Sequence, residues 1–371
     1  MFRNVWIEVD LRKLRRNYQR IRRIVGKKTK IIATVKQSAY GHGLVPIAQE
    51  LSKVGVDFFG VGSLEEAISL RDAGLREDIL VLSVVLSKGA EYFLKYNIRP
   101  TVVTVKFAKE LNREAARRKK VLPVHVKIDT GMGRLGPYYS QAYKFLKEVK
   151  RLKNISLEGI FTHFPVADTD PEFTEYQIDI FNRFISQLSQ EGINFRYQHW
   201  ANSTTLANYP HSHFNMVRPG LILYGIKPSP NIDFDGEPIL SLKSKIIFLK
   251  KIKKGMGVSY GRTYIAKKAT SIATVAVGYA DGYPWNLSNR AKVIIGGRLF
   301  DLAGRVCMDH IMVDLREKGK AQVGDEVILI GKSKNVKITP EEIAQWAKTI
   351  PYEIVSRLSL KIPRIYKFAS A

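Results

Sequence analysis

The chain has 371 residues, of which 45% are hydrophobic, and its lysines and arginines exceed its acidic residues by 26 charges. A chain of this length can bury a large core, and it favours two domains. No stretch reaches the roughly 18 uninterrupted apolar residues that a membrane span needs, and the N-terminus lacks the apolar core of a secretion signal. The one cysteine, Cys307, cannot form an intrachain disulfide. We therefore expect a cytoplasmic protein with no membrane segment.

The excess positive charge is spread over the whole chain. Local basic runs occur at residues 20–23, 117–120 and 250–254. Aromatic residues do not alternate with these runs, as they do on surfaces that stack nucleic-acid bases, and no nucleic-acid motif accompanies them. The pattern favours solvated helix faces and turns over a nucleic-acid site.

Residues 1–230 alternate between short apolar segments and helical patterns. The first helix begins after Asp10, a helix-capping residue, and ends at Gly26. Eight short strands are expected at residues 31–35, 57–61, 79–84, 101–105, 123–128, 157–162, 195–200 and 214–218. Eight strands separated mostly by helices are typical of a (β/α)8 TIM barrel. A doubly wound sheet is the alternative, but the number of strands favours closure into a barrel.

The pattern of predicted secondary structure changes in residues 231–371. Strand-like segments follow one another without intervening helices, joined by glycine-rich turns, and a late helix is expected at residues 338–349. This pattern predicts a second, mainly antiparallel β domain. The boundary is expected in the polar, proline-rich stretch 227–238.

Lys36 ends the first expected barrel strand and is followed by Gly41 and Gly43. Loss of solvation at such a position lowers the pKa of the amine and makes its neutral, nucleophilic form accessible. That is the chemistry of a Schiff-base lysine, whose commonest cofactor is pyridoxal phosphate. A structural or phosphate-binding lysine remains an equal alternative on this motif alone.

Polar groups also follow four other expected strands. Arg134 comes after the fifth, His163 after the sixth, Ser203 after the seventh and Arg218 after the eighth. Active sites of barrels form where the strands end, and phosphate commonly binds after the last two strands. The coincidence of five polar groups with five strand ends predicts one functional site at this rim.

The order of the short motifs resembles that of the alanine racemase family, which depends on pyridoxal phosphate. The resemblance covers nearly the whole chain. It rests on residues 35–36 (VK), 39–43 (AYGHG), 127–136 (KIDTGMGRLG), 162–164 (THF), 201–203 (ANS), 218–220 (RPG), 224–225 (YG), 258–261 (VSYG), 278–282 (GYADG), 307–309 (CMD) and 352–353 (YE).

The resemblance implies a homodimer in which both subunits contribute residues to each active site. Lys36 would carry the cofactor and act as one base, while Tyr260, contributed by the other subunit, would act as the second base on the opposite face of the substrate. The C-terminal domain would thus contribute to the partner subunit's active site. Lys127 matches a lysine that is carbamylated in the family, with an ordinary ion pair as the alternative.

The resemblance also implies binding roles, and it implies no metal. The residues expected to bind the cofactor are Lys36, Tyr40, Leu82, Arg134, His163, Asn202, Ser203, Arg218, Gly220, Leu221 and Tyr352. Those expected to bind substrate are Arg134, Met308, Tyr260 and Tyr279. His42 and Cys307 have no role that the sequence alone supplies.

We therefore expect a racemase that interconverts L- and D-alanine and supplies D-alanine for peptidoglycan synthesis. Racemisation of another small amino acid, such as serine, is the nearest alternative. A decarboxylase on the same fold is disfavoured by Arg218, which would face the pyridine nitrogen where decarboxylases typically place a carboxylate. A non-catalytic cofactor-binding protein would not need the second β domain.

Overall fold

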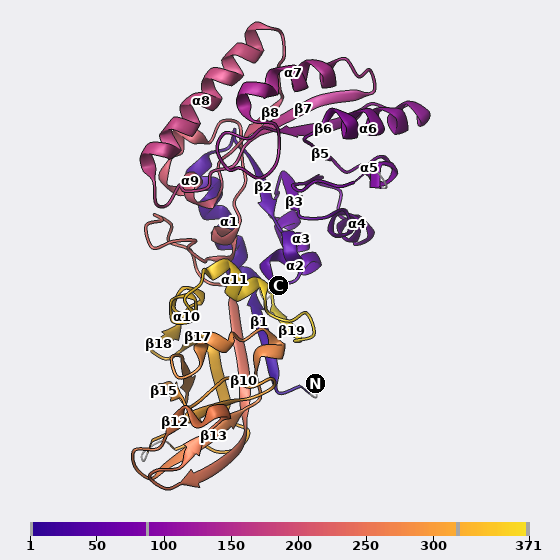
Figure 1. Ribbon diagram of the computed structural model, residues 1–371. Coiled ribbons are helices and arrows are strands. Elements are labelled where there is room, and N and C mark those ends of the chain that lie inside the picture. Colours follow the sequence, from indigo (N-terminus) through magenta and orange to yellow (C-terminus); the bar gives the residue numbers. More distant parts are fainter. Residues whose placement is uncertain (1–2, 87–88, 317–319, 369–371) are drawn as a thin grey trace.

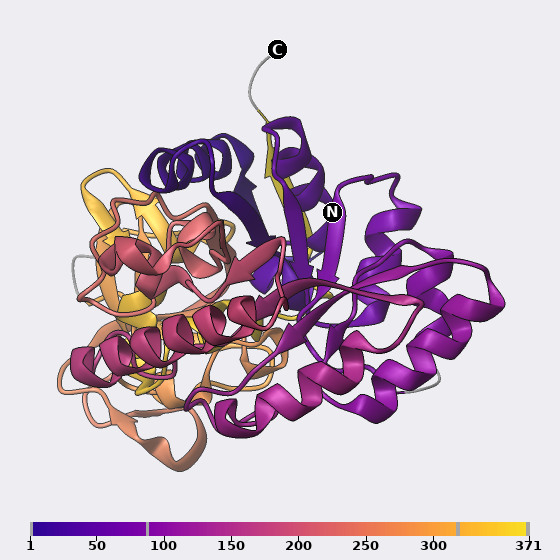
Figure 2. The same cartoon turned by 90° about the horizontal axis from the view of Figure 1, so that it is seen from above.

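The computed structural model describes residues 3–86, 89–316 and 320–368 and divides into a barrel and a β domain, one above the other in Figure 1. Seen from above, in Figure 2, the barrel helices lie outside the strands and the second domain lies beneath. Within the described part of the chain, no helix is long and apolar enough to cross a membrane.

The eight expected barrel strands all form, with ends that differ from expectation by a few residues. They are β2 (Lys30–Thr34), β3 (Phe58–Val61), β4 (Asp78–Val81), β5 (Thr101–Val102), β6 (Leu122–Lys127), β7 (Ile155–Phe161), β8 (Tyr197–His199) and β9 (Met216–Val217). The helices are α1 (Leu11–Val25), α3 (Leu44–Lys53), α4 (Leu64–Asp72), α5 (Ala90–Lys95), α6 (Val105–Arg117), α7 (Tyr139–Lys150), α8 (Pro171–Gln190) and α9 (Ser203–Asn208).

The parallel strands form two runs, β4-β3-β2-β9 and β5-β6-β7-β8. The runs meet where Leu80 bridges the segment at Arg99, and where the Arg218 N–H donates to the Ala201 carbonyl at 2.8 Å. The barrel therefore closes, as the count of strands predicted, and all eight carboxyl ends point to one rim.

The second domain is built on one mainly antiparallel sheet, in the order β18-β17-β14-β15-β16-β13-β10-β1-β19. Its strands are β10 (Leu240–Ile252), β13 (Thr270–Val275), β14 (Lys292–Ile295), β15 (Arg298–Leu302), β16 (Ile311–Asp314), β17 (Glu326–Ser333), β18 (Val336–Ile338) and β19 (Arg364–Lys367), with a small separate pair β11 (Gly257–Val258) and β12 (Tyr264–Ile265). The late helix forms as α10 (Pro340–Ala347), capped by Thr339, and α11 (Pro351–Ser356) follows it.

The first strand, β1 (Val5–Asp10), was not expected, and it lies in the second domain's sheet. It pairs antiparallel with β10 and parallel with β19. Its alternating burial, with Val5, Ile7 and Val9 inside, is that of a strand with one face on a core. The chain thus starts in the second domain and enters the barrel at α1, whose N-cap is Asp10.

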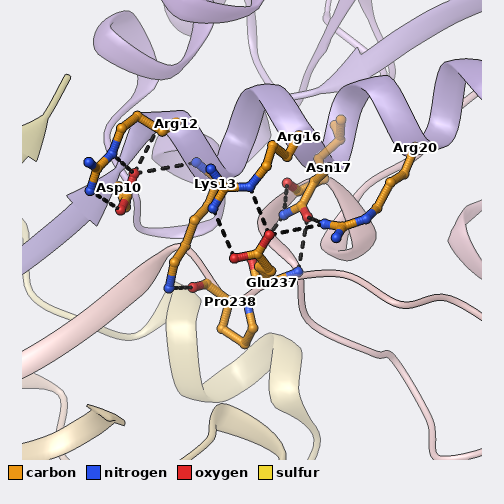
Figure 3. A network of polar contacts seen from close by, with 9 residues as sticks. Asp10, Arg12, Lys13, Arg16, Asn17, Arg20, Glu237 and Pro238 are labelled. Atoms are coloured by element: carbon orange, nitrogen blue, oxygen red, sulfur yellow. Dashed lines mark hydrogen bonds and ion pairs between the residues drawn. The ribbon is translucent and has the colours of Figure 1, made fainter. Parts of the chain in front are cut away.

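A polar joint ties α1 to the segment that leaves the barrel (Figure 3). Arg16 binds the Glu237 carboxylate with two nitrogens, at 2.8 and 2.9 Å. The buried Asn17 side chain donates to the Glu237 carbonyl at 2.9 Å and accepts from its N–H at 3.0 Å. Satisfying both backbone groups of one linker residue fixes the path of the chain between the domains.

Candidate active site

A cavity of about 260 Å³ lies at the carboxyl ends of the barrel strands. Its lining comprises Thr34, Lys36, Tyr40, Leu82, Lys127, Arg134, Leu135, Phe161, His163, Asn202, Ser203, Arg218, Gly220 and Tyr352. Of the residues expected to bind cofactor, Leu221 alone is outside this lining, and it is fully buried at the start of the 3-10 turn Leu221–Tyr224.

Thr34, Leu135 and Phe161 line the cavity without having been expected there. Thr34 and Phe161 are the last residues of β2 and β7. Their place at strand ends was readable from the sequence, but an apolar or hydroxyl side chain there carries no chemical signal of its own.

The turn that follows Lys36 is left-handed. In the segment labelled α2 (Lys36–Tyr40), the residues from Gln37 to Tyr40 all have φ of 52–53°. Left-handed backbone costs each non-glycine residue roughly 1–2 kcal/mol. Such strain persists only where the surroundings impose it, and it often marks a functional site.

His42 is one of the groups that impose this turn. Its Nδ1–H donates to the carbonyls of Ala39 and Tyr40, at 2.8 and 2.9 Å, and its ring stacks on Tyr224 with centroids 4.5 Å apart. Burial lowers the pKa of His42 to about 4, although these hydrogen bonds oppose the shift, so the ring is neutral near pH 7. A left-handed turn directs backbone carbonyls away from the N–H groups that they would bond in a right-handed helix. His42 therefore supplies the hydrogen-bond donor for two of these carbonyls.

The second domain holds the same segment from the other side. Arg364 in β19 donates from Nε to the Gly41 carbonyl at 2.8 Å, and the Tyr366 hydroxyl donates to the His42 carbonyl at 3.1 Å. Gly43 has φ of +104°, and a Cβ there would collide with the Tyr366 hydroxyl. Glycine is required at this position by both conformation and space.

The cavity is strongly cationic. Lys36, Lys127, Arg134 and Arg218 line it, and its lining includes no aspartate or glutamate. Burial, and after it the charge of Arg134, lowers the pKa of Lys36. The same two causes lower the pKa of Lys127 to about 8, while its Nζ donates to the Leu135 carbonyl at 3.0 Å. The cavity thus suits an anionic ligand and contains amines that lose their proton easily.

One end of the cavity forms a niche for a phosphate group. The Gly220 N–H donates to the Ser203 hydroxyl at 2.9 Å, and a Cβ on Gly220 would lie 2.8 Å from the Tyr40 hydroxyl. Burial raises the pKa of Tyr40, and it raises that of Tyr352 to about 12, so both phenols remain protonated donors near pH 7. Hydroxyl donors, a small residue and nearby cations fit the phosphate of pyridoxal phosphate.

Arg218 is buried and held by acceptors that carry no full charge. Its Nη2 donates to the carbonyls of Thr162 and Trp200, at 2.8 and 3.2 Å, and lies 3.5 Å from His163 Nδ1. Its Nη1 lies 2.8 Å from His199 Nδ1. A guanidinium fixed in this way can donate a hydrogen bond to a bound ring but cannot supply a proton to it readily.

Three residues expected at the site lie elsewhere in the single chain. Tyr260, Tyr279 and Met308, which we call the exposed trio, are on the second domain and expose 70%, 43% and 54% of their surface. Backbone hydrogen bonds join the two segments that carry Tyr279 and Met308, since the Tyr279 N–H donates to the Cys307 carbonyl at 3.0 Å and the Ala280 N–H to the Met308 carbonyl at 3.0 Å. None of the trio lines the cationic cavity.

Within residues 3–86, 89–316 and 320–368, no group of three or more His, Cys, Asp or Glu side chains could hold a metal ion.

Comparison with known proteins gives a consistent result. Residues 9–228 match the family model "Alanine racemase, N-terminal domain", and residues 239–366 match "Alanine racemase, C-terminal domain". The alanine racemase of Halothermothrix orenii is 43% identical, over 98% of this chain and 97% of its own length.

Solved structures agree in fold over the full length. Alanine racemase of Clostridium difficile 630 has a TM-score of 0.93 and 36% identity, covering 99% of this chain and 96% of its own. That of Bartonella henselae, solved with covalently bound pyridoxal phosphate, has a TM-score of 0.89 and 27% identity, covering 98% and 99%.

Proposed function

The chain belongs to the alanine racemase family, and from that premise we propose how its own residues interconvert L- and D-alanine. The observation that carries the proposal is the cavity at the barrel rim, where Lys36, whose pKa is lowered, lies with three other cationic side chains beside a phosphate niche. Pyridoxal phosphate fits that combination, and when bound it supplies an electron sink for negative charge at the substrate's Cα.

Binding of the cofactor is assigned to the residues of the cavity. Tyr40, Ser203 and Gly220 would hold the phosphate, and Arg218 would donate a hydrogen bond to the pyridine nitrogen. Because an arginine in this place would not readily give up a proton, the bound ring would be a weaker electron sink than a protonated one, which would limit side reactions. Arg134 would bind the cofactor's phenolic oxygen and the substrate carboxylate.

Lys36 removes or returns the Cα proton on one face of the substrate. Its Nζ is mostly buried next to other cations, and the lowered pKa makes the free amine available near neutral pH. The left-handed turn after Lys36, held by His42 and the second domain, fixes the direction from which the amine approaches.

Racemisation also needs a proton donor and acceptor on the opposite face. Tyr40 and Tyr352 are poor candidates because burial raises the pKa of both. We assign the role to Tyr260 of a second copy, since the exposed trio lies outside the chain's own cavity. The enzyme is then a homodimer in which each second domain completes the other subunit's site, with Met308 and Tyr279 beside the substrate.

Lys127 is proposed to carry a carbamate. Its pKa of about 8 gives a substantial fraction of free amine near neutral pH. A free amine adds to CO2, forming an N–C bond and releasing one proton, and no other reactant is needed. The resulting anion would offset the charge of Arg134. Carbon-13 NMR with labelled bicarbonate checks this: a carbamate signal is expected in the wild type and not in Lys127→Ala, and a signal that survives the substitution contradicts it.

The biological setting follows from the reaction. D-alanine is a component of peptidoglycan, and we propose that the enzyme supplies it. The single cysteine fits a reducing compartment, and this supports our proposal that the enzyme works in the cytoplasm.

The decisive experiment follows hydrogen exchange at Cα. Purified protein with pyridoxal phosphate is incubated in heavy water with a panel of L-amino acids, followed by NMR and chiral analysis. Exchange with inversion on alanine is expected. Faster inversion of serine would keep the mechanism and change the substrate, whereas cofactor binding without exchange on any amino acid would refute the mechanism.

A further inference from the structure

A chain of polar side chains runs through the interior of the barrel and ends at Arg218. His199 Nε2 lies 2.8 Å from His125 Nδ1, and His125 Nε2 faces the Glu158 carboxylate at 3.5 Å. Glu158 in turn accepts from Arg99 Nε at 2.6 Å. His125 and His199 are completely buried. We call Arg218, His199, His125 and Glu158 the barrel relay.

The relay departs from the usual filling of such barrels, which is layers of branched apolar side chains. An apolar cluster of Ile32, Phe58, Leu80, Tyr197 and Met216 packs beside the relay, and its Tyr197 stacks on His125 with ring centroids 5.9 Å apart. Burying polar groups costs free energy unless each donor meets an acceptor. Two buried histidines are therefore costly unless their protons are arranged along the chain without conflict.

Only one arrangement of protons sets a donor opposite an acceptor at every contact of the relay, where the 3.5 Å contact of His125 Nε2 with Glu158 is electrostatic and forms no hydrogen bond. Arg218 can only donate, so His199 Nδ1 must present a lone pair to Nη1. A neutral His199 then carries its proton on Nε2 and donates to His125 Nδ1. A neutral His125 must in turn carry its proton on Nε2, the nitrogen that faces the Glu158 carboxylate.

We propose that His125 and Glu158 are positioning residues that hold His199 as its Nε2–H tautomer, so that His199 and the Arg218 guanidinium remain matched acceptor and donor. If the ring protons of His199 and His125 were on Nδ1 instead, the His199 Nδ1–H would face an Arg218 N–H. Two donors would then face each other without an acceptor. Glu158, the middle residue of β7, thereby acts on a side chain at the carboxyl rim of the barrel through two imidazole rings.

The charges along the relay are consistent with this arrangement. Burial, and then the charge of Arg218, lowers the pKa of His199, and burial lowers the pKa of His125, so both rings are neutral. Burial raises the pKa of Glu158, but its interactions with His125 and Arg99 outweigh burial and bring the pKa to about 2. Two neutral rings thus lie between a cation and an anion, and the field between those charges polarises the hydrogen bonds in one direction.

The function of the relay rests on the proposed function only in its last step, the contact of Arg218 with the cofactor ring. The first experiment therefore uses cofactor-free protein, in which the relay can be tested whether or not the enzyme racemises alanine. With nitrogen-15 in the seven histidines, NMR distinguishes protonated from unprotonated ring nitrogens. His199 and His125 are both expected as neutral Nε2–H tautomers, and a proton on Nδ1 of either ring overturns the proposal.

The second experiment compares two glutamates that each bridge basic side chains. Glu158→Gln removes the charge at the end of the relay, whereas Glu114→Gln is the control, because Glu114 pairs with Arg117 and Arg118 on α6 outside the barrel. Glu158→Gln should produce a mixture of His199 tautomers, and Glu114→Gln should not.

In the cofactor-loaded enzyme, Glu158→Gln should shift the absorbance of the bound cofactor and lower kcat by about tenfold, the size of one hydrogen bond to a charged group. KM for alanine should change little, because Glu158 lies far from substrate in the relay. If Glu158→Gln keeps a single His199 tautomer and an unshifted absorbance, as Glu114→Gln is expected to do, the positioning role is refuted. If Glu158→Gln fails to fold, the tautomers of the wild-type protein still decide the question.

Discussion

The cationic cavity and the exposed trio differ in how each is held. Around the cavity, side chains are buried and fixed by many hydrogen bonds, as at Arg218 and in the turn after Lys36. The trio of Tyr260, Tyr279 and Met308 lies open to solvent on the second domain. The lining of the cavity therefore comes from a single chain, while the group proposed for the opposite face becomes enclosed only against another surface.

The largest effect is expected in the cavity. Lys36→Ala should reduce racemisation in both directions by about 10⁴-fold or more, because it removes both the attachment of the cofactor and one proton carrier. Chiral chromatography of alanine measures the loss. Lys120→Ala, at an exposed lysine, is the control, and substantial racemisation by Lys36→Ala would contradict the assignment of the base.

The Tyr260→Phe substitution tests the role of the exposed trio. Racemisation should fall by about 10²–10⁴-fold, the usual contribution of one acid–base group, while Cα exchange of one enantiomer in heavy water should survive on the face served by Lys36. Equal loss of exchange for both enantiomers would contradict a role confined to one face.

Mixing the two inactive variants tests whether the halves come from different subunits. In a random mixture of Lys36→Ala and Tyr260→Phe, half of the dimers are mixed and each mixed dimer has one intact site, so about a quarter of wild-type activity should return. Native mass spectrometry verifies that the subunits have exchanged. If activity does not recover after that exchange, a shared site is ruled out.

A smaller effect tests how the second domain holds the turn after Lys36. Gly43→Ala should destabilise the protein by about 3 kcal/mol, because the new Cβ would collide with the Tyr366 hydroxyl. Gly55→Ala is the matched control, since Gly55 also has positive φ but open space around it, and it should cost about 1 kcal/mol. Urea unfolding measures both.

Removing the obstructing hydroxyl sharpens this test. Tyr366→Phe in the Gly43→Ala background should restore part of the lost stability. Equal costs at Gly43 and Gly55, or no recovery with Tyr366→Phe, would show that contact with the second domain does not constrain this turn.

The smallest test concerns acid. The pKa of Glu158 is lowered from 4.5 to about 2 in the folded chain, so its stabilisation is present above about pH 4.5 and lost as the pH falls toward 2. The full loss is about 3 kcal/mol. Urea midpoints at about pH 7 and about pH 3 should therefore differ less in Glu158→Gln than in the wild type, and an identical difference would contradict the linkage.

Much of the fold followed from local patterns. The eight barrel strands, the capped helix after Asp10 and the late helix after Thr339 each had a periodicity or a capping residue of their own. Strand β1 was missed because residues 5–10 precede the barrel in sequence, and only their pairing with β10 and β19 shows where they belong. Pairing between segments hundreds of residues apart leaves little trace in a single sequence.

The sequence by itself determined which chemical groups this protein carries and in what order, because motif chemistry resides in residue types and short spacings. It pointed to Lys36, Arg134 and Arg218 at strand ends, which the structure gathers around one cavity. Only the tertiary structure decided the hand of the turn after Lys36, the use of His42 to hold it, and the proton arrangement of the barrel relay. Those features depend on which donor contacts which acceptor in the folded chain. The free-energy cost of burying a polar group depends on that partner, and the partner is set by the tertiary structure rather than by the residue type alone.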